Sequence, residues 1–387
     1  MKRLLQIGLD SLLTSIIPIL TWLSLGLLLD KNLINVFAIV YPLLFVGNMI
    51  KCVFIDGANI SAERGKNKNE VYSAIVIGII IATIVVTLLV FNVENYLTFM
   101  NVEVEIYKIF TSYAIIQMYL SLILKFILVK LYYEEKNTLA NRYSIKFNLL
   151  NFVLIISMSI ISKNYFIIVT TTLIILTIYT MYILFKNLVK FKLQVNLINW
   201  IKYNSASLVN STFFLVIFLF GLRNVFEFGE VYVVALAFIH LITDAQWDVF
   251  NAINEVARID ISKGVFDYKS LLKNAYKLFG LLFLSMVIMF AALYSFFNVN
   301  IWIALTYLGL ELICFLIWPL YIIKTNYLQI EYSAKKVSAN KIVTNILRTA
   351  CSFLRTPFCT IIGQMVSAIY QLITITIMYR VATSTKK

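Results

Sequence analysis

The stretch "AIVIGIIIATIVVTLLVF" at residues 74–91 decides the fold class, because it runs for its whole length without a charged residue. A second uncharged block, "YFIIVTTTLIILTIYTMYILF", occupies residues 165–185. A helix needs about 20 largely apolar residues to cross the hydrocarbon core of a bilayer. Backbone groups cannot stay unpaired in lipid, and these blocks lack the short alternating segments of a β-barrel. Each block therefore predicts a transmembrane helix.

The composition extends that prediction to the whole chain. Of the 387 residues, 61% are hydrophobic and 13% are charged, and the mean hydropathy is +0.88. A soluble domain carries about 25% charged residues. We predict about twelve spans of membrane-crossing length, near residues 4–29, 34–59, 71–92, 106–131, 141–162, 165–187, 198–221, 231–257, 274–297, 301–324, 339–356 and 360–380. The first is too long for a signal-peptide core and lacks a cleavage site, so we expect it to remain as a helix.

The net charge is +14, and the distribution of the basic residues along the chain predicts the membrane topology. Lysine and arginine gather in alternate loops, whereas the loop at 92–105 is acidic. This positive-inside pattern predicts a multi-pass protein of the cell membrane with both termini in the cytoplasm. The expected partner of the basic loops is the lipid bilayer with its anionic headgroups, and no nucleic acid. The basic residues are Arg64, Lys66, Lys68, Lys136, Arg142, Lys186, Lys190, Lys192, Arg258, Lys263, Lys269, Lys335, Lys336 and Lys341.

The two halves of the chain carry matching patterns. "DSLLTS" at 10–15 is echoed by "ASLVNS" at 206–211. The pattern D-x-x-N-x-x-x-E occurs as Asp56, Asn59 and Glu63 and again as Asp248, Asn251 and Glu255. A unit of six spans used twice gives both copies the same orientation, as parallel repeats. We therefore predict an all-α polytopic membrane protein of two six-helix bundles, residues 1–190 and 198–387, joined by a cytoplasmic linker at 191–197.

A polar stripe interrupts the eighth predicted span. His240, Asp244, Asp248 and Asn251 recur at spacings that place them on one helical face. A carboxylate at the centre of a membrane helix costs about 2.5–3.5 kcal/mol, so it is a functional candidate by default. Two carboxylates one turn apart in a medium of low dielectric do not both ionise easily. Asp244 and Asp248 are therefore candidates for taking up a proton or holding one Na⁺.

Two further segments point to a family. The second span runs into the basic loop "ANISAERGKNKNEVYSA" (58–74), and the polar loop in "KLYYEEKNTLANRYSIKFNLLNFVL" (130–154) leads into a helix carrying Asn148 and Asn151. With its two six-span halves, the chain resembles the multidrug and toxic compound extrusion (MATE) transporters over nearly its whole length. These belong to the multidrug/oligosaccharidyl-lipid/polysaccharide exporter superfamily. The resemblance implies two bundles in a V, a cleft lined by the first, second, seventh and eighth spans, and export driven by H⁺ or Na⁺.

The resemblance also implies roles for particular residues. Glu311 fits the tenth-span position at which many members carry the coupling ion, and Asp244 and Asp248, with Asn251, fit the eighth-span region. Residues on the cleft spans are candidate substrate contacts: Asp10, Trp22, Asp56, Asn59, His240 and Trp247. The two tryptophans suit an organic cation through cation–π attraction, with packing inside the bundle as the alternative.

The sequence departs from the family pattern in its first span. Many prokaryotic members carry an acid late in that span, but "ILTWLSLGLLL" (19–29) has none, which places an N-terminal coupling site in doubt. Lys51 and Arg348 also lie within spans. Lys51 has Asp56 as a possible partner, although residues five apart face each other imperfectly on a helix. Arg348 has Glu311 as a possible partner, and such a pair would neutralise the candidate coupling residue.

Three functions fit these features. The first is a secondary transporter that exports small organic cations or amphipathic compounds by antiport with H⁺ or Na⁺. The second is a flippase for lipid-linked saccharides, with Lys51 and Arg348 receiving a pyrophosphate. The third is a membrane partner that does not transport. The sequence has no ATP-binding loop and no metal-binding motif, so we predict neither an enzyme nor a cofactor beyond the coupling ion, and we expect a monomer.

The charge pattern makes a direct prediction about topology. Single cysteines at Lys190 and Asn101 are expected to react with membrane-impermeant reagents from opposite faces of the membrane, with residue 190 on the cytoplasmic side. Labelling of intact cells and inverted vesicles measures this. Reaction of both cysteines from outside would contradict the topology.

Overall fold

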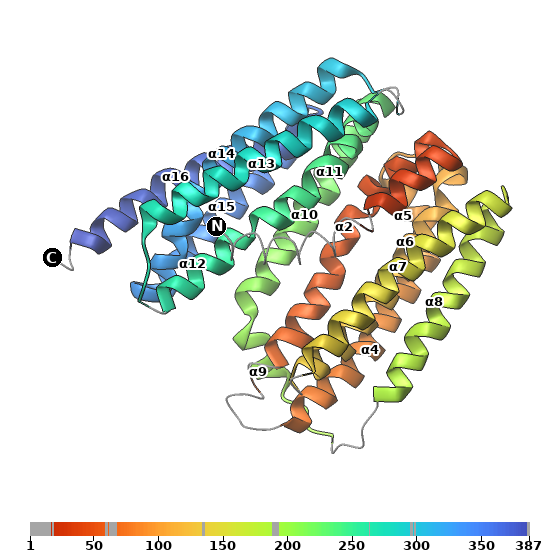
Figure 1. The fold of residues 1–387 in the computed structure, drawn as a ribbon, viewed down its shortest axis with the longest axis horizontal. Helices are drawn as coiled ribbons and strands as arrows, with labels where there is room; N and C mark the ends of the chain where they lie inside the picture. Colours follow the sequence, from red (N-terminus) through yellow and green to blue (C-terminus); the bar gives the residue numbers. More distant parts are fainter. Residues whose placement is uncertain are drawn as a thin grey trace. The chain divides into compact units, whose positions relative to one another are not determined.

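The computed structural model describes residues 17, 19–58, 61, 68–133, 136–187, 193–262, 264–294, 297 and 299–384, and these residues form helices and the turns between them. After the short helix Ile19–Leu28, the N-terminal part contains η1 (Lys31–Leu33), α2 (Ile34–Lys51) and the π-helix η2 (Cys52–Gly57). It continues with α4 (Lys68–Phe91), α5 (Val93–Phe99), α6 (Val104–Tyr133), α7 (Asn137–Ile161), α8 (Tyr165–Asn187) and α9 (Leu197–Tyr203). The C-terminal part comprises α10 (Ser205–Glu227), α11 (Glu230–Phe250), α12 (Ala252–Ser262), α13 (Tyr268–Leu293), α14 (Ile301–Glu331), α15 (Ala334–Ser352) and α16 (Cys359–Ser384) (Figure 1).

Nine segments of the described chain are helical, long and apolar enough to cross a membrane. They are Lys31–Gly57, Asn69–Phe91, Tyr107–Leu128, Thr138–Ile161, Tyr165–Asn187, Ser207–Glu227, Tyr268–Leu293, Ile301–Glu331 and Cys359–Ser384. Each of them corresponds to a predicted span, which confirms the all-α polytopic fold class. Most of the first predicted span lies outside the described residues, and a short apolar helix, Ile19–Leu28, represents its end.

Two predicted spans are interrupted by an asparagine. The seventh was expected as one helix over 198–221, but α9 ends before Asn204 and α10 begins after it. Asn204 has a non-helical backbone, with φ −125° and ψ 23°. Its Nδ2 donates to the carbonyl oxygen of Cys52 at 3.0 Å. The eighth was expected over 231–257, and it divides at Asn251 into α11 and α12.

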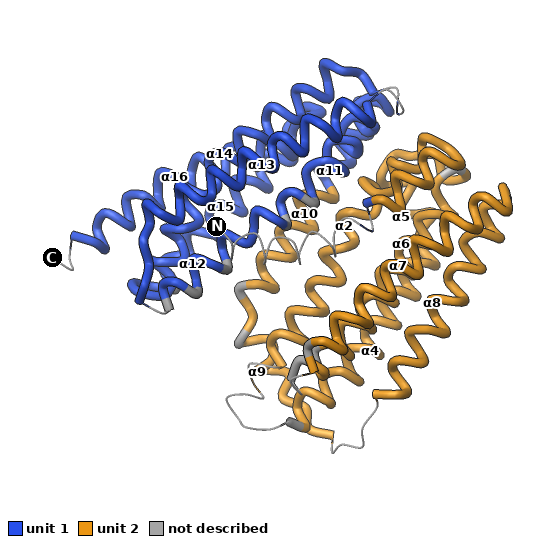
Figure 2. The backbone as a smooth tube through the Cα atoms, viewed as in Figure 1, with its two compact units in different colours: residues 1–19, 220–387 blue, residues 20–219 orange. Residues whose placement is uncertain are grey.

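The chain divides into two compact units (Figure 2). Unit 2 is Leu20–Leu219, and unit 1 is Met1–Ile19 with Phe220–Lys387. The division falls inside α10, beyond the predicted linker at 191–197, because the first part of α10 packs on α2. The Phe214 and Phe218 rings stack on Phe45, each with centroids 5.4 Å apart. Further along α10, Asn224 Nδ2 donates to the Ser352 carbonyl at 2.8 Å, within unit 1.

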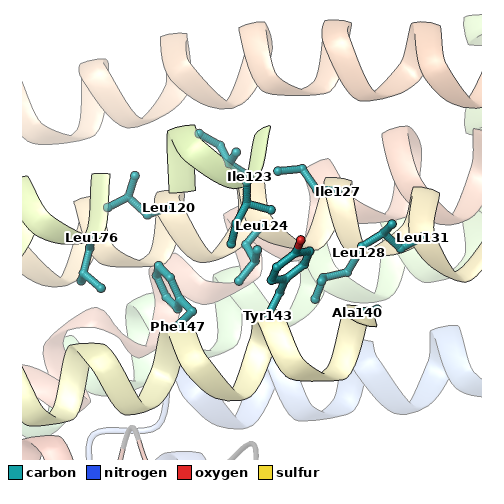
Figure 3. Close-up of a cluster of buried hydrophobic side chains, with 11 residues drawn as sticks. Leu120, Ile123, Leu124, Ile127, Leu128, Leu131, Ala140, Tyr143, Phe147 and Leu176 are labelled. Carbon is teal, nitrogen blue, oxygen red and sulfur yellow. The ribbon is translucent and has the colours of Figure 1, made fainter. Parts of the chain in front are cut away.

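Each unit has an apolar interior of its own. In unit 2, side chains of α6, α7 and α8 interdigitate around Leu124, Tyr143 and Leu176 (Figure 3). In unit 1, α14, α15 and α16 bury Leu328, Val337 and Ile375. Large apolar side chains also lie on the outer faces, where lipid rather than water is the expected neighbour. Those of α4 recur at helical spacing: Ile80, Ile84, Leu88 and Phe91.

The short helix α9 is anchored to unit 2 by its tryptophan. Trp200 is completely buried beside Val53, Ala58 and Ala74. Its Nε1 donates to Glu70 Oε2 at 3.3 Å. The same carboxylate oxygen accepts from Ser61 Oγ at 2.7 Å. The segment before α10 is thus held to the start of α4 by a buried acid.

This packing predicts an effect of Gly57→Ala. A Cβ at residue 57 would lie 2.0 Å from the Trp200 carbonyl oxygen, so η2 or α9 must shift. Overpacking of this kind costs about 1–3 kcal/mol. We expect a melting temperature several degrees lower in detergent. Gly280→Ala is the matched control, because no atom lies within 4 Å of its Cβ position, and alanine favours a helix. Equal melting temperatures for the two variants would contradict the close packing.

Candidate functional site

The candidate site lies in unit 1 and is built around the acid of the longest described helix. Asn300 caps the N-terminus of helix α14: its side chain accepts from the backbone N–H groups of Trp302 and Ile303 at 3.1 and 3.3 Å. The first three turns carry Glu311 into the interior, where the residue is 5% exposed. A buried acid in a membrane-spanning helix needs partners from neighbouring helices, because hydrocarbon offers none.

Two other helices supply those partners. Trp247 Nε1 on α11 donates to Glu311 Oε2 at 3.1 Å, and Gln364 Nε2 on α16 donates to the same oxygen at 3.2 Å. Both bonds end on Oε2, and Oε1 receives none from the described residues. The carboxyl group is therefore fixed at one oxygen, while the other is available for a proton or a cation.

Arg348 reaches this acid through an amide. Its Nη2 donates to Gln364 Oε1 at 3.0 Å, so Gln364 accepts from the cation and donates to the acid. Within the described structure Glu311 forms no direct ion pair with Arg348; Gln364 stands between them. The positive charge of Arg348 is still close enough to act on both Glu311 and His240.

The Trp247 ring is held by aromatic stacking. It lies 3.8 Å from the ring of Phe315 with an interplanar angle of 18°. Phe250 and Trp318 approach its edges at 6.1 and 6.0 Å. Such contacts fix the direction of the indole N–H toward Glu311. The ring is packed inside unit 1, as the packing alternative anticipated, and its polar edge reaches the site.

The remaining residues of the eighth-span stripe lie at different depths. His240 is 7% exposed, Asp244 is half-buried one turn further along α11, and Asn251 is exposed at the end of the helix. The backbone of Asp248 is helical, but its side chain lies outside the described residues. Among the residues that the structure describes, no three acidic, cysteine or histidine side chains are grouped to hold a metal.

The candidate residues of the N-terminal half lie in unit 2 or are not described. Asp10 and Asn59 fall outside the described residues. Trp22 is 8% exposed and packs edge-on against Tyr113, with centroids 6.1 Å apart. Asp56 lies in η2, where its Oδ2 is 3.9 Å from Lys51 Nζ. The predicted pairing of Lys51 with Asp56 is therefore observed.

Sequence reasoning missed Gln364. Its signal is weak, because one glutamine in the apolar stretch "CTIIGQMVSAIY" (359–370) does not stand out from other polar residues of membrane helices. Its position relative to Glu311 depends on how α14 and α16 pack, and hydropathy does not report this.

Comparison with known proteins identifies the fold. No protein-family model matches the chain, and no curated protein matches it by sequence. Solved structures do match over the whole length. An inward-facing multidrug resistance MATE family transporter of the MOP superfamily is 13% identical, covers 100% of this chain and 99% of its own, and gives a TM-score of 0.74. An outward-facing MATE transporter gives 0.62 at 12% identity, with 99% and 96% coverage.

A third matching structure is of a transporter for which a different function is suggested. It is a MOP superfamily transporter from Pyrococcus furiosus Vc1, described as having a binding pocket of reverse polarity that suggests a different function. It is 13% identical, covers 99% of this chain and 96% of its own, and gives a TM-score of 0.62. The chain therefore has a fold similar to that of these solved MATE transporters, as the resemblance implied.

The site geometry predicts that Gln364→Leu destabilises unit 1. The substitution removes a donor to the buried Glu311 and an acceptor for Arg348, and lost bonds to charged groups cost about 1–3 kcal/mol. Gln371→Leu is the matched control on the same helix. Gln371 Nε2 donates to the Thr344 hydroxyl at 3.2 Å, and that hydroxyl keeps its own bond to the Asn340 carbonyl. A melting temperature in detergent no lower for Gln364→Leu than for Gln371→Leu would contradict the bridging role.

Proposed function

We propose that the chain is a secondary active transporter that exports small organic compounds, cationic or amphipathic, by antiport with H⁺ or Na⁺. The observation that carries the proposal is the buried acid Glu311, whose Oε2 accepts from Trp247 and Gln364 while Oε1 accepts nothing from the described residues. The membrane-transporter fold supports it.

The geometry suits a carboxyl group that changes its charge during a cycle. Neutral donors at Oε2 stabilise the ionised carboxylate but still allow it to be protonated. A directly paired arginine would instead hold the carboxylate in its ionised form. Oε1 then accepts the proton or contributes one oxygen to Na⁺. Loss of the ion leaves a negative charge that attracts a cationic substrate, and return of the ion releases it. Antiport requires this competition, because ion and substrate must not leave together.

Other residues complete the proposed cycle. Asp244, Asp248 and Asn251 on the eighth span are proposed to share the ion with Glu311. Cleft contacts are proposed for Asp10, Trp22, Asp56, Asn59, His240 and Trp247. We further propose that the protein acts as a monomer in the plasma membrane, with both termini in the cytoplasm, as the basic loops predict. Cycling between inward-open and outward-open states would carry the substrate across.

A flippase for lipid-linked saccharides is the second candidate, and Arg348 favours it. A guanidinium group beside Gln364 suits a pyrophosphate better than it suits an organic cation. The two candidates differ in the charge of what they carry. Competition for transport by a lipid-linked pyrophosphate, with no effect of organic cations, would support the flippase and contradict the exporter.

Transport by purified protein in proteoliposomes tests the proposal. We expect Glu311→Gln to reduce efflux driven by a proton or sodium gradient at least about a hundredfold, because the amide neither binds nor releases the ion. Folding should be preserved, since Gln keeps an acceptor oxygen for Trp247 and Gln364.

The matched control for this experiment is Glu227→Gln. That acid lies at the end of α10, half exposed and 3.4 Å from Arg223 Nε, so its loss should leave efflux unchanged. Full gradient-driven efflux by Glu311→Gln would refute the assignment. Absence of gradient-driven transport of any tested compound by the wild type would favour the reading as a membrane partner that does not transport.

A further inference from the structure

A second charged site lies in unit 2, at the end of the span Lys31–Gly57. Lys51 closes α2, and Asp56 lies within the π-helix η2. Residues five apart point about 140° away from each other in an α-helix. The i→i+5 hydrogen bonds of a π-helix bring such residues to the same side, and π-helical turns are frequent at functional sites. The break in helical geometry therefore creates this pair.

The pair is loosely made and accessible. Lys51 Nζ and Asp56 Oδ2 are 3.9 Å apart, and their side chains are 43% and 40% exposed. Neither residue has another hydrogen bond or ion pair in the described structure. An ammonium group has three donor hydrogens and a carboxylate has two acceptor oxygens, so both groups retain most of their binding capacity.

The surroundings make this a polar patch at the end of a membrane helix. Asn48, one turn before Lys51, is exposed. Cys52, next to Lys51, lies 3.9 Å from Ser211 Oγ on α10. Ile50 and Ile55, which precede Lys51 and Asp56 in the sequence, are buried and pack into the apolar core with Phe126. The charged face is thus distinct from the face that holds the helix in unit 2.

The charges themselves select the ligand. A ligand with only an anionic group would satisfy Lys51 but would stand next to the carboxylate of Asp56. A ligand with only a cationic group would meet the same problem at Lys51. A zwitterion whose two charges lie a few ångströms apart satisfies both residues and adds no net charge to the membrane.

We propose that Lys51 and Asp56, with Asn48, form a binding site for a zwitterionic group, in which the ligand's anion contacts Lys51 and its cation contacts Asp56. The source is either a zwitterionic lipid headgroup or a free zwitterionic compound. A role for this site in contacting the transported substrate rests on the proposed transport function. Binding of a zwitterionic group to the site does not depend on that function.

Binding of three probes with the same alkyl chain tests the site. The probes are dodecylphosphocholine, dodecyltrimethylammonium and dodecyl phosphate, each below its micelle concentration, with the full-length protein in phosphatidylglycerol nanodiscs. We expect wild-type protein to bind the zwitterion at least about tenfold more tightly than either other probe. Lys51→Gln should shift the preference to the cationic probe, and Asp56→Asn should shift it to the anionic probe. Equal binding of all three probes, or unchanged preferences in both variants, would overturn the proposal.

Controls separate this result from misfolding and from the transport cycle. The pair of Lys108 with Glu94 is also exposed in unit 2, so the double variant Lys108→Gln, Glu94→Gln should bind the probes as the wild type does. Glu311→Gln should keep the zwitterion preference while losing transport, which makes the two failures distinguishable. If phosphatidylethanolamine nanodiscs weaken probe binding to the wild type but not to Asp56→Asn, the ligand is a headgroup. If they do not, it is a free zwitterion.

Discussion

An acid inside a membrane-spanning helix has to be satisfied by the protein, and unit 1 is arranged around this requirement. Glu311 lies on α14, and its two hydrogen-bond donors lie on α11 and α16. The three helices must therefore keep their register relative to one another. The stacking of Trp247 on Phe315 and the bond from Arg348 to Gln364 act on the donors rather than on the acid. A site held by neutral groups is stable with a charge and without one, and an ion-coupled cycle demands this property.

Unit 2 meets the same requirement in two other ways. Glu70 is buried, and its Oε2 accepts hydrogen bonds from Ser61 and Trp200. These bonds hold α9 to the start of α4. Lys51 and Asp56 are accessible, and their charges offset each other across a loose pair. Like Glu311, Glu70 accepts both of its hydrogen bonds at Oε2. The two acids differ in their partners: one donor to Glu70 lies on the short helix α9, whereas the donors to Glu311 lie on α11 and α16, and Gln364 also accepts from Arg348. Lys51 and Asp56 differ from both acids because their side chains are exposed.

Hydropathy was sufficient to predict most of the fold. Long uncharged blocks such as 74–91 have only one solution in a bilayer. The nine segments of the described chain that are long and apolar enough to cross a membrane agree with predicted spans. The breaks at Asn204 and Asn251 were not predictable, because the sequence around each asparagine is compatible with a continuous helix. The π-helix η2 was missed because hydropathy does not distinguish i→i+5 from i→i+4 hydrogen bonding. Glu311 was recognised through the family resemblance, whereas Gln364 required the packing of α14 on α16. The division at residue 219 reflects aromatic packing of α10 on α2, which the repeat pattern does not encode.

The central claim is that Glu311 gains and loses charge while its neutral partners stay in place. Infrared difference spectroscopy of the purified protein, recorded on raising the pH or adding Na⁺, measures this directly. The account predicts a band of a protonated carboxyl group that disappears on this change, is absent in Glu311→Gln, and shifts in Trp247→Phe because the indole donor is lost. A spectrum without such a band, or one that is the same in the wild type and Glu311→Gln, would show that the charge of Glu311 is fixed and would contradict the account.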